Sequence, residues 1–314
     1  MLVSLADRLN LIVWKNAHRC PQWLMNPIAN IAADATWLLK TSGVKQLQKN
    51  LSRVKPEQDP RQIKKLARIA MRSYFRYFAE SLKLPSLSQE QIAARVRLEA
   101  EHHYYDAVQT GNSVQLTLMH MGNWDLAGAY ATRVLGPVTT VAERLKPAEL
   151  YEHFLTHREN LGLKVLTAGD PGVFRQLLKV GKTPGKLICL LADRDLSANG
   201  VEAELFGHTV RVAAGPAALA LAGVPLLPTA IYYEKLRGQR RKKAGSSYGI
   251  VVHFHPQVTV PEQGSKEQKI KDVTGQWLQA LSRDIARAPQ DWHMLQKVFV
   301  EDLDQAKYQA IVGK

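Results

Sequence analysis

The sequence is poor in cysteine and has no long apolar run. It contains two cysteines, Cys20 and Cys189, which are too few for a disulfide framework or a cysteine-based zinc site and fit a reducing compartment. Cys189 lies in the apolar run 187–191, where we expect it to be buried. No uninterrupted apolar stretch of roughly 18 residues occurs, so no transmembrane helix is predicted.

Acidic residues are outnumbered by basic ones. The 314 residues include 42 Lys and Arg but 28 Asp and Glu, a formal net charge of +14. Such an excess favours anionic partners, namely nucleic acid, acidic lipid surfaces or phosphorylated small molecules. The N-terminal apolar segment is divided by Lys15 and lacks the features of a signal peptide. We therefore expect a peripheral protein at the cytoplasmic face of the cell membrane.

Aromatic residues are also scarce, at 7% of the chain. No RRM, KH, zinc-finger or helix-turn-helix signature accompanies the basic charge. A basic nucleic-acid-binding protein is therefore the weaker interpretation, and we expect no nucleic acid as a partner. An acidic phospholipid surface and phosphorylated small molecules remain.

Apolar runs of strand length alternate with amphipathic segments of helix length. Hydrophobic residues make up 46% of the chain, enough for a substantial core. The alternation predicts an α/β fold: a single domain over residues 1–314, with a mixed, largely parallel central sheet flanked by helices. The predicted strands are 114–119, 138–141, 164–166, 187–192, 226–232 and 249–254. The predicted helices include 61–82, 87–101, one from Pro147, 172–180 and 266–288.

Residues 1–105 form the predicted helical portion, and 106–314 the α/β catalytic core. Residues 1–40 suggest two short helices broken at Pro21 and Pro27, packed on the core, lying on lipid, or both. Basic residues recur every four positions in 61–82, which is typical of a solvated face and compatible with phosphate or acidic lipid. The basic segment 236–248 suggests a mobile hairpin tip near the membrane. The pair His102–His103 lacks a third ligand at helical spacing and does not predict a metal site.

The segment SVQLTLMHMGNWDL, residues 113–126, carries the first candidate chemistry. Its apolar run predicts a buried strand, and His120 follows at the carboxyl end, where ligands bind in open α/β sheets. Histidine can act as a base there because it titrates near neutral pH. Asp125 could orient the imidazole, or could merely favour a helix N-terminus. No serine or cysteine nucleophile is adjacent, which favours direct attack by a substrate hydroxyl.

A second carboxylate is predicted at the same sheet edge. The buried run LICLLA, residues 187–192, ends in Asp193-Arg194-Asp195. Because the carboxyl ends of parallel strands meet at one edge, Asp193 could pair with His120 across the sheet. The alternative is a surface turn with an internal ion pair.

Six segments occur in an order that resembles a known family. They are LMHMGNWDLAG, VAERLKPAELY, HRENLGLKVL, LADRDLSANGVEAELFG, GPAALALAGVPLLP and APQDWHMLQKVF, and they extend over about two thirds of the chain. Together they resemble the bacterial lipid A lauroyl/myristoyl acyltransferases, which carry a His-x4-Asp motif. The resemblance implies transfer of a palmitoyl-type chain from acyl-CoA, as substrate, to the 6-hydroxyl of a mannose on a glycosylated phosphatidylinositol. It implies no cofactor and no metal.

The resemblance also implies roles for individual residues. His120 would be the base, Asp125 the motif carboxylate and Arg158 a phosphate-binding residue. The family's relay acid is a glutamate in the segment matching LLADRDL, where this chain has Asp193, so the partner of His120 could be Asp193 or Asp125. Further substrate-binding candidates are Glu143, Arg144, Lys146 and Arg194. Backbone N–H groups near Gly122 and Asn123 are candidates for stabilising the oxyanion, and a lipid A-type secondary acyltransferase is the alternative function.

Overall fold

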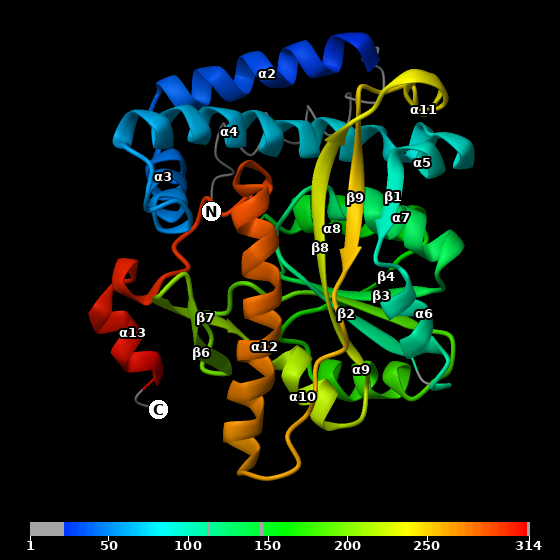
Figure 1. Ribbon diagram of the computed structural model, residues 1–314, viewed down its shortest axis with the longest axis vertical. Coiled ribbons are helices and arrows are strands. Elements are labelled where there is room, and N and C mark those ends of the chain that lie inside the picture. Colours follow the sequence, from blue (N-terminus) through cyan, green and yellow to red (C-terminus); the bar gives the residue numbers. More distant parts are fainter. Residues whose placement is uncertain (1–21, 112, 145–146, 313–314) are drawn as a thin grey trace.

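A seven-stranded sheet runs through the middle of the protein (Figure 1). The structure is a computed structural model that describes residues 22–111, 113–144 and 147–312. The strand order is β1-β9-β8-β2-β5-β3-β4, and every neighbouring pair is parallel except β8 and β9. The predicted mixed, largely parallel sheet flanked by helices is therefore confirmed. The strands are β1 (Val96–Glu99), β2 (Val114–Leu118), β3 (Val138–Ala142), β4 (Lys164–Thr167), β5 (Leu187–Leu191), β8 (Leu226–Lys235) and β9 (Tyr248–Phe254).

Helices cover both faces of the sheet. On one face, Trp277 and Leu281 of α12 (Lys266–Arg287) pack in one buried cluster with Val251 of β9. On the other face, Leu126 of α7 (Trp124–Val134) shares a cluster with Val252. Consecutive residues of β9 therefore point their side chains into cores on opposite faces of the sheet, as the alternation of side chains along a strand requires. The remaining core helices are α6 (His102–Val108), α8 (Ala148–Asn160), α9 (Val173–Gly181) and α10 (Gly215–Leu221).

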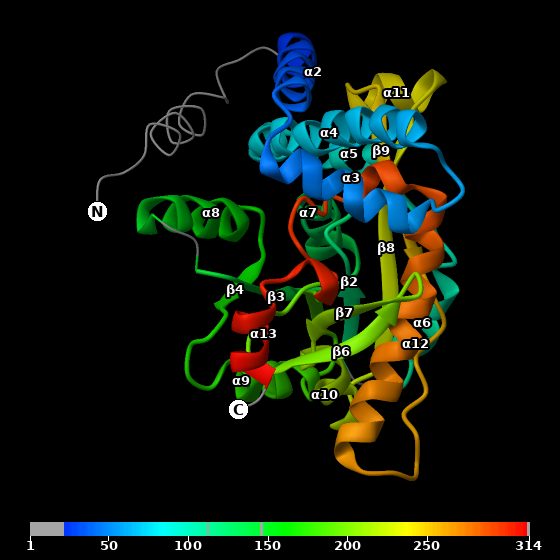
Figure 2. The ribbon, with the colours of Figure 1, turned by 90° about the vertical axis from the view of Figure 1, so that its left-hand side faces the viewer.

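Helices from the first hundred residues cross one end of the sheet (Figures 1 and 2). They are α2 (Gln22–Leu38), α3 (Ser42–Val54), α4 (Pro60–Lys83) and α5 (Gln89–Arg95). The predicted helix break at Pro27 is wrong, because Pro27 lies inside α2. Met25 and Ala29 on either side of it are buried against Ala79 of α4, and this packing offsets the hydrogen bond that proline removes. The predicted break at Pro21, and Cys20, lie outside the described residues.

The predicted helix 87–101 is also wrong in its second half. α5 ends at Arg95, and β1 then pairs in parallel with β9. Val96 is buried and Arg97 is exposed, an alternation that fits a sheet edge, but four residues are too few to reveal the period. The interpretation of 236–248 as a hairpin tip is incomplete, since this segment contains the helix α11 (Gly238–Ala244), which Arg240 holds to the backbone oxygen of residue 94.

Two further features were not predicted. β6 (Gly200–Leu205) and β7 (His208–Ala213) form a separate antiparallel pair beside α12. The basic residues of α4 are partly engaged within the protein, because Arg68 and Arg72 contact Asp34 of α2 at 2.6 and 2.5 Å.

The C-terminal elements are the 3₁₀ helices η3 (Pro289–Asp291) and η4 (Val300–Asp302) and the α-helix α13 (Gln305–Val312). Within the described ranges, no helix combines the length and the apolar character needed to cross a bilayer.

Candidate active site

His120 and Asp193 meet at the carboxyl edge of the sheet. β2 and β5 are adjacent and parallel, with Leu118 in register with Leu191. His120 and Asp193 each lie two positions beyond these strand ends, so the register brings them together. The His120 Nδ1 and Asp193 Oδ1 atoms are 2.6 Å apart. The pairing of His120 with a carboxylate across the sheet is therefore confirmed.

Asp193 is buried and holds His120 through both carboxylate oxygens. Its Oδ2 accepts the backbone N–H of His120 at 3.0 Å and the indole N–H of Trp292 at 3.1 Å. Burial opposes ionisation of Asp193, but His120 and these donors outweigh it and lower the pKa of Asp193. Burial likewise disfavours the imidazolium, yet the charge of Asp193 raises the pKa of His120 above its ordinary value. The carboxylate thus favours the protonated state that a base must reach during proton transfer.

The imidazole remains accessible. Its side chain is 39% exposed and lines a cleft of about 310 Å³ beneath α4. Because Nδ1 contacts Asp193, Nε2 is the ring nitrogen left to receive a substrate proton. Among the described residues, this cleft gathers no group of three side chains with metal-ligand spacing.

The turn after His120 cannot provide the expected oxyanion donor at Gly122. Gly122 has a φ of +63°, and a Cβ there would lie 2.5 Å from the carbonyl oxygen of Ile231 in β8. Its N–H already donates to the backbone oxygen of Asp291 at 2.9 Å. The proposal of Gly122 as a donor is therefore wrong, because the close contact with β8 and η3 uses that group. Asn123 is buried, and its side chain caps α7 and contacts Glu80.

Asp125 is not the partner of His120. It is the second residue of α7, and its buried carboxylate accepts the Tyr77 hydroxyl at 2.8 Å and Nε of Arg158 at 2.9 Å. Burial raises the cost of ionising Asp125, but the Arg158 charge outweighs it and lowers the pKa of Asp125. The pKa of Arg158 is raised in turn, chiefly by Asp125 against the opposing effect of burial. The alternative left open by the sequence is settled geometrically in favour of Asp193.

The other predicted residues are divided between the cleft and its surroundings. Glu143, Arg158 and Arg194 line the cleft. Arg194 also donates to the backbone oxygen of residue 297 at 3.2 Å. Arg144 is exposed and pairs with Asp170 at 3.1 Å rather than lining the cleft. Lys146 lies outside the described residues.

His293 was missed by the sequence analysis. It lines the cleft, and its backbone N–H donates to the carbonyl oxygen of His120 at 2.7 Å. Burial and the nearby charges of His120 and Arg76 lower the pKa of His293 to about 3, so this ring is neutral at physiological pH. The segment PQDWHM was noted only as part of the resemblance. Neither periodicity nor spacing could link it to a strand end more than a hundred residues away.

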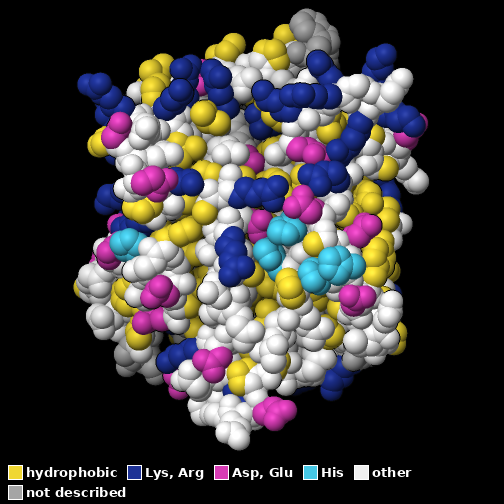
Figure 3. All heavy atoms as spheres, viewed as in Figure 1, with side chains coloured by type: hydrophobic (Ala, Val, Ile, Leu, Met, Phe, Trp, Pro, Cys, Tyr) yellow, Lys and Arg dark blue, Asp and Glu magenta, His cyan; other side chains and the backbone are white. Residues whose placement is uncertain are grey.

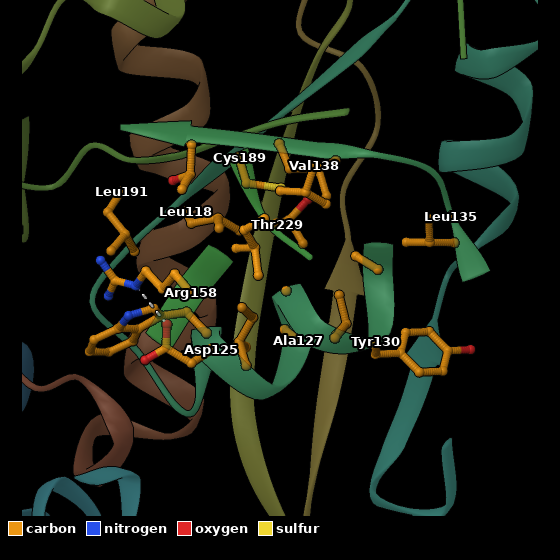
Figure 4. Close-up of a pocket in the computed structure, with 18 of the residues that line it drawn as sticks. Leu118, Asp125, Ala127, Tyr130, Leu135, Val138, Arg158, Cys189, Leu191 and Thr229 are labelled. Carbon is orange, nitrogen blue, oxygen red and sulfur yellow. Dashed lines mark hydrogen bonds and ion pairs between the residues drawn. The ribbon is translucent and has the colours of Figure 1, made fainter. Parts of the chain in front are cut away.

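An apolar cavity continues from the cleft under α7 (Figure 4). The cleft and this cavity share Trp124, Val141, Arg158 and Leu191 as lining residues. Arg158, Asp125 and Leu191 lie at one end of the cavity, and Tyr130 and Leu135 at the other. The cavity lies between α7 and the sheet and is lined mainly by apolar side chains. Its volume is about 50 Å³, below the roughly 300 Å³ at which ligand pockets usually begin, so a long hydrocarbon chain would fit only after the lining side chains move.

Comparison with known proteins matches this chain to one family along most of its length. The model of the bacterial lipid A biosynthesis acyltransferase family matches residues 1–301. A phosphatidylinositol mannoside acyltransferase of Mycolicibacterium smegmatis is 33% identical over 299 residues, which cover 94% of this chain and 91% of that protein. A protein of the same name from Mycobacterium tuberculosis is 33% identical over 278 residues, covering 87% of this chain and 82% of that protein.

Proposed function

Because the chain belongs to the bacterial lipid A biosynthesis acyltransferase family, we propose that it acylates phosphatidylinositol mannosides from acyl-CoA. The product would be a long-chain, palmitoyl-type ester at the 6-hydroxyl of a mannose. The names of two 33% identical relatives support this acceptor. The observation that carries the proposal is the half-buried His120, held by buried Asp193 beside an apolar cavity.

His120 acts as the general base. Nε2 removes the proton of the attacking sugar hydroxyl as its oxygen bonds to the thioester carbonyl carbon. Asp193 holds the ring in place and stabilises the imidazolium that forms. When the tetrahedral intermediate collapses, the C–S bond breaks and the imidazolium returns its proton to the departing thiolate. A base in this position contributes roughly 10²–10⁴-fold to the rate.

Arg158 stabilises the oxyanion in this proposal. The N–H of Gly122 is engaged by Asp291, so we assign the developing negative charge to the guanidinium of Arg158. Arg158 lines both the cleft and the apolar cavity, where the thioester carbonyl would lie. Asp125 fixes the guanidinium through Nε. The position of the Arg158 guanidinium suits the reacting carbonyl better than the phosphates of CoA, which would lie farther away. We assign those phosphates to Arg194, Arg144 and Lys146. Glu143 would contact the acceptor sugar.

The acyl chain enters the apolar cavity beneath α7, which widens from its present volume of about 50 Å³ to hold it. Its carbonyl end would lie at Arg158 and Leu191, and its methyl end near Tyr130 and Leu135 (Figure 4). Transfer of apolar surface from water to this cavity supplies the binding free energy of the chain. The length of the cavity would then limit the length of chain that is accepted.

The end of the molecule formed by α2, α4 and α11 docks on the cytoplasmic face of the membrane. Exposed Ile31 and Leu39 of this region are 70% and 77% accessible. Lys and Arg side chains gather over the same helices at the upper end of the face in Figure 3. Apolar side chains among basic ones favour an interfacial position on anionic lipid. α4 also contributes Tyr74, Tyr77 and Phe78 to the cleft, so an acceptor could reach His120 from this end.

The test is acyl transfer by purified protein with a panel of acceptors. With palmitoyl-CoA, we expect product from a phosphatidylinositol mannoside and none from a lipid A precursor. The His120→Ala variant should retain its melting temperature and lose roughly 10²–10⁴-fold in kcat. His208→Gln, which alters another histidine next to a carboxylate, is the matched control. A folded His120→Ala variant with full activity would exclude the base, and preference for the lipid A precursor would favour the alternative acceptor.

A further inference from the structure

Two histidines and an aspartate converge away from the cleft. His253 belongs to β9, and His255 follows one residue after the strand, so both face the same side. His253 Nδ1 is 2.9 Å from Oδ1 of Asp284 in α12, and His255 Nε2 is 2.5 Å from Oδ2 of the same carboxylate. The ring centroids are 4.4 Å apart. A single carboxylate thus holds two imidazoles at the contact between β9 and α12.

The sheet separates this cluster from the apolar cavity under α7. Val252, the neighbour of His253, lines that cavity on the opposite face. Asp284 is buried, whereas the side chains of His253 and His255 are 20% and 12% exposed. Histidine side chains also lie together near the middle of the face in Figure 3. The buried carboxylate of Asp284 therefore holds the cluster in place, while the two partly exposed imidazoles can be reached by ions from solvent.

The donor set is that of a metal site. We infer that His253, His255 and Asp284 bind a first-row divalent metal ion of the zinc class. Their ligand atoms all lie within 4.8 Å of one another. Three protein ligands of the imidazole and carboxylate type, with a position left for water, are characteristic of zinc, whereas calcium and magnesium prefer oxygen ligands throughout.

The ligand atoms must shift to bind an ion. Zinc bonds of about 2.0–2.1 Å in a tetrahedron place neighbouring ligand atoms about 3.3 Å apart. The two nitrogen–oxygen contacts, at 2.9 and 2.5 Å, would open by less than about 1 Å as the metal replaces the shared protons. Ligand atoms that now lie up to 4.8 Å apart would close by about 1.5 Å.

The negative charge available to a cation is that of Asp284. Glu99 of β1 lies opposite His253 in the sheet register. Its carboxylate accepts N–H groups of Arg97 at 3.0 Å and of Arg287 at 3.2 Å, so its charge is shared between two guanidinium groups. Asp284 then supplies a net negative charge when both imidazoles are neutral. The ring centroids of the neighbouring His102 and His103 are 4.0 Å apart, with the rings tilted by 47°, and neither residue belongs to the set with ligand spacing.

Binding would tie β9 to α12. The two elements otherwise meet through the apolar cluster that contains Val251, Trp277 and Leu281. A ligand that binds only the folded chain stabilises it in proportion to its concentration over Kd. The ion would therefore raise the melting temperature without contacting the acyl-transfer residues.

The test uses the full chain after removal of metal with a chelator. Titration calorimetry with zinc chloride, and the visible spectrum after cobalt substitution, report stoichiometry and coordination. We expect one tightly bound ion per chain, a four- or five-coordinate cobalt spectrum, and a melting temperature raised by zinc. His253→Gln and His255→Gln should each weaken binding by at least about tenfold and remove that increase.

His208→Gln is the matched control, because His208 also pairs with a carboxylate, at 3.1 Å from Glu301. It should bind zinc as the unaltered chain does. Partly exposed histidines are replaced rather than buried Asp284, so the metal-free variants should keep the melting temperature of the metal-free parent. Equal zinc affinity in the parent and both β9 variants, or an unchanged melting temperature on adding zinc, would overturn the inference.

Discussion

The imidazole of His120 and the carboxylate of Asp193 are 73 positions apart in sequence, and their nearest atoms are 2.6 Å apart. Neither residue depends on a loop that must close to bring them together. Both leave neighbouring strands of one sheet, and Trp292 holds the carboxylate from a third direction. Such preorganisation means that the pair should be assembled before substrate binds.

The pH dependence of turnover should report this contact. The proposed base is the neutral imidazole, so activity should rise with pH through the pKa of His120, which Asp193 raises. Asp193→Asn removes that charge, so the acid limb of the kcat profile should move to lower pH while the plateau falls. Profiles between roughly pH 5 and 8 measure both effects. An unchanged acid limb in this variant would mean that Asp193 does not act through the imidazole.

Replacing Arg158 should separate its charge from its geometry. Arg158→Lys keeps a cation near buried Asp125 but loses the planar guanidinium that contacts it at 2.9 Å. We expect kcat with acyl-CoA to fall about tenfold or more, with the acid limb unmoved. Arg158→Gln would leave the charge of Asp125 unpaired and destabilise the fold by about 3–5 kcal/mol.

The control for the Arg158→Lys variant is Arg175→Lys, on the exposed face of α9, which should keep normal kcat. Normal kcat in the Arg158→Lys variant would argue against oxyanion stabilisation by Arg158.

The apolar cavity should set chain-length preference. Ala127 lines it between the two ends, and Ala127→Phe would fill part of its length. The ratio of activity with palmitoyl-CoA to that with lauroyl-CoA should therefore fall about tenfold or more, since each methylene left unburied costs about 0.8 kcal/mol. Ala129→Val, in the same helix but outside the cavity lining, should leave the ratio unchanged while testing for general overpacking. Equal ratios in both variants would place the chain elsewhere.

Membrane association should depend on α2 and its C-terminal end. Ile31→Glu and Leu39→Glu each replace an exposed apolar side chain with a negative charge. Partitioning into vesicles that contain anionic phospholipid should fall about tenfold or more for each variant. Val134→Glu, at an exposed position on α7, is the control for general effects of charge. Unaltered vesicle binding by the α2 variants would assign docking to another surface.

Stability in acid should depend on Asp302. Its carboxylate contacts Nη1 of Arg53 at 2.7 Å, joining η4 to α3. Arg53 lowers the pKa of Asp302 to about 2. A depressed pKa contributes stability that is present above about pH 4 and is lost as pH falls through 2. Asp302→Asn should therefore lower the free energy of unfolding by about 1–2 kcal/mol at neutral pH, with the difference shrinking in acid.

Denaturant titrations at several pH values measure this difference. Asp304→Asn is the matched control, because Asp304 is exposed and its ion pair with the Lys307 ammonium is loose, at 3.9 Å. It should change the free energy of unfolding by less than about 0.5 kcal/mol. A constant difference between the Asp302 variant and its parent from pH 7 to pH 2 would contradict the linkage.

The sequence predicted best where apolar runs deliver polar residues to a sheet edge. The runs before His120 and Asp193 are long enough to identify as strands, and parallel topology then places their ends together. It could not choose between Asp125 and Asp193, because the direction of Asp125 depends on how α7 packs against Tyr77. It missed β1 because four residues show too little alternation. It did not identify His293 as a residue of the cleft, because the position of His293 depends on contacts with residues distant in sequence.

The shared register of β2 and β5 constrains how this enzyme family can vary. A residue added between Leu118 and His120, or between Leu191 and Asp193, would move one member of the pair out of place. A residue removed within β5 would shift every later side chain to the opposite face of the sheet, so Asp193 would turn away from the imidazole. Insertions and deletions compatible with catalysis should therefore fall outside 114–120 and 187–193.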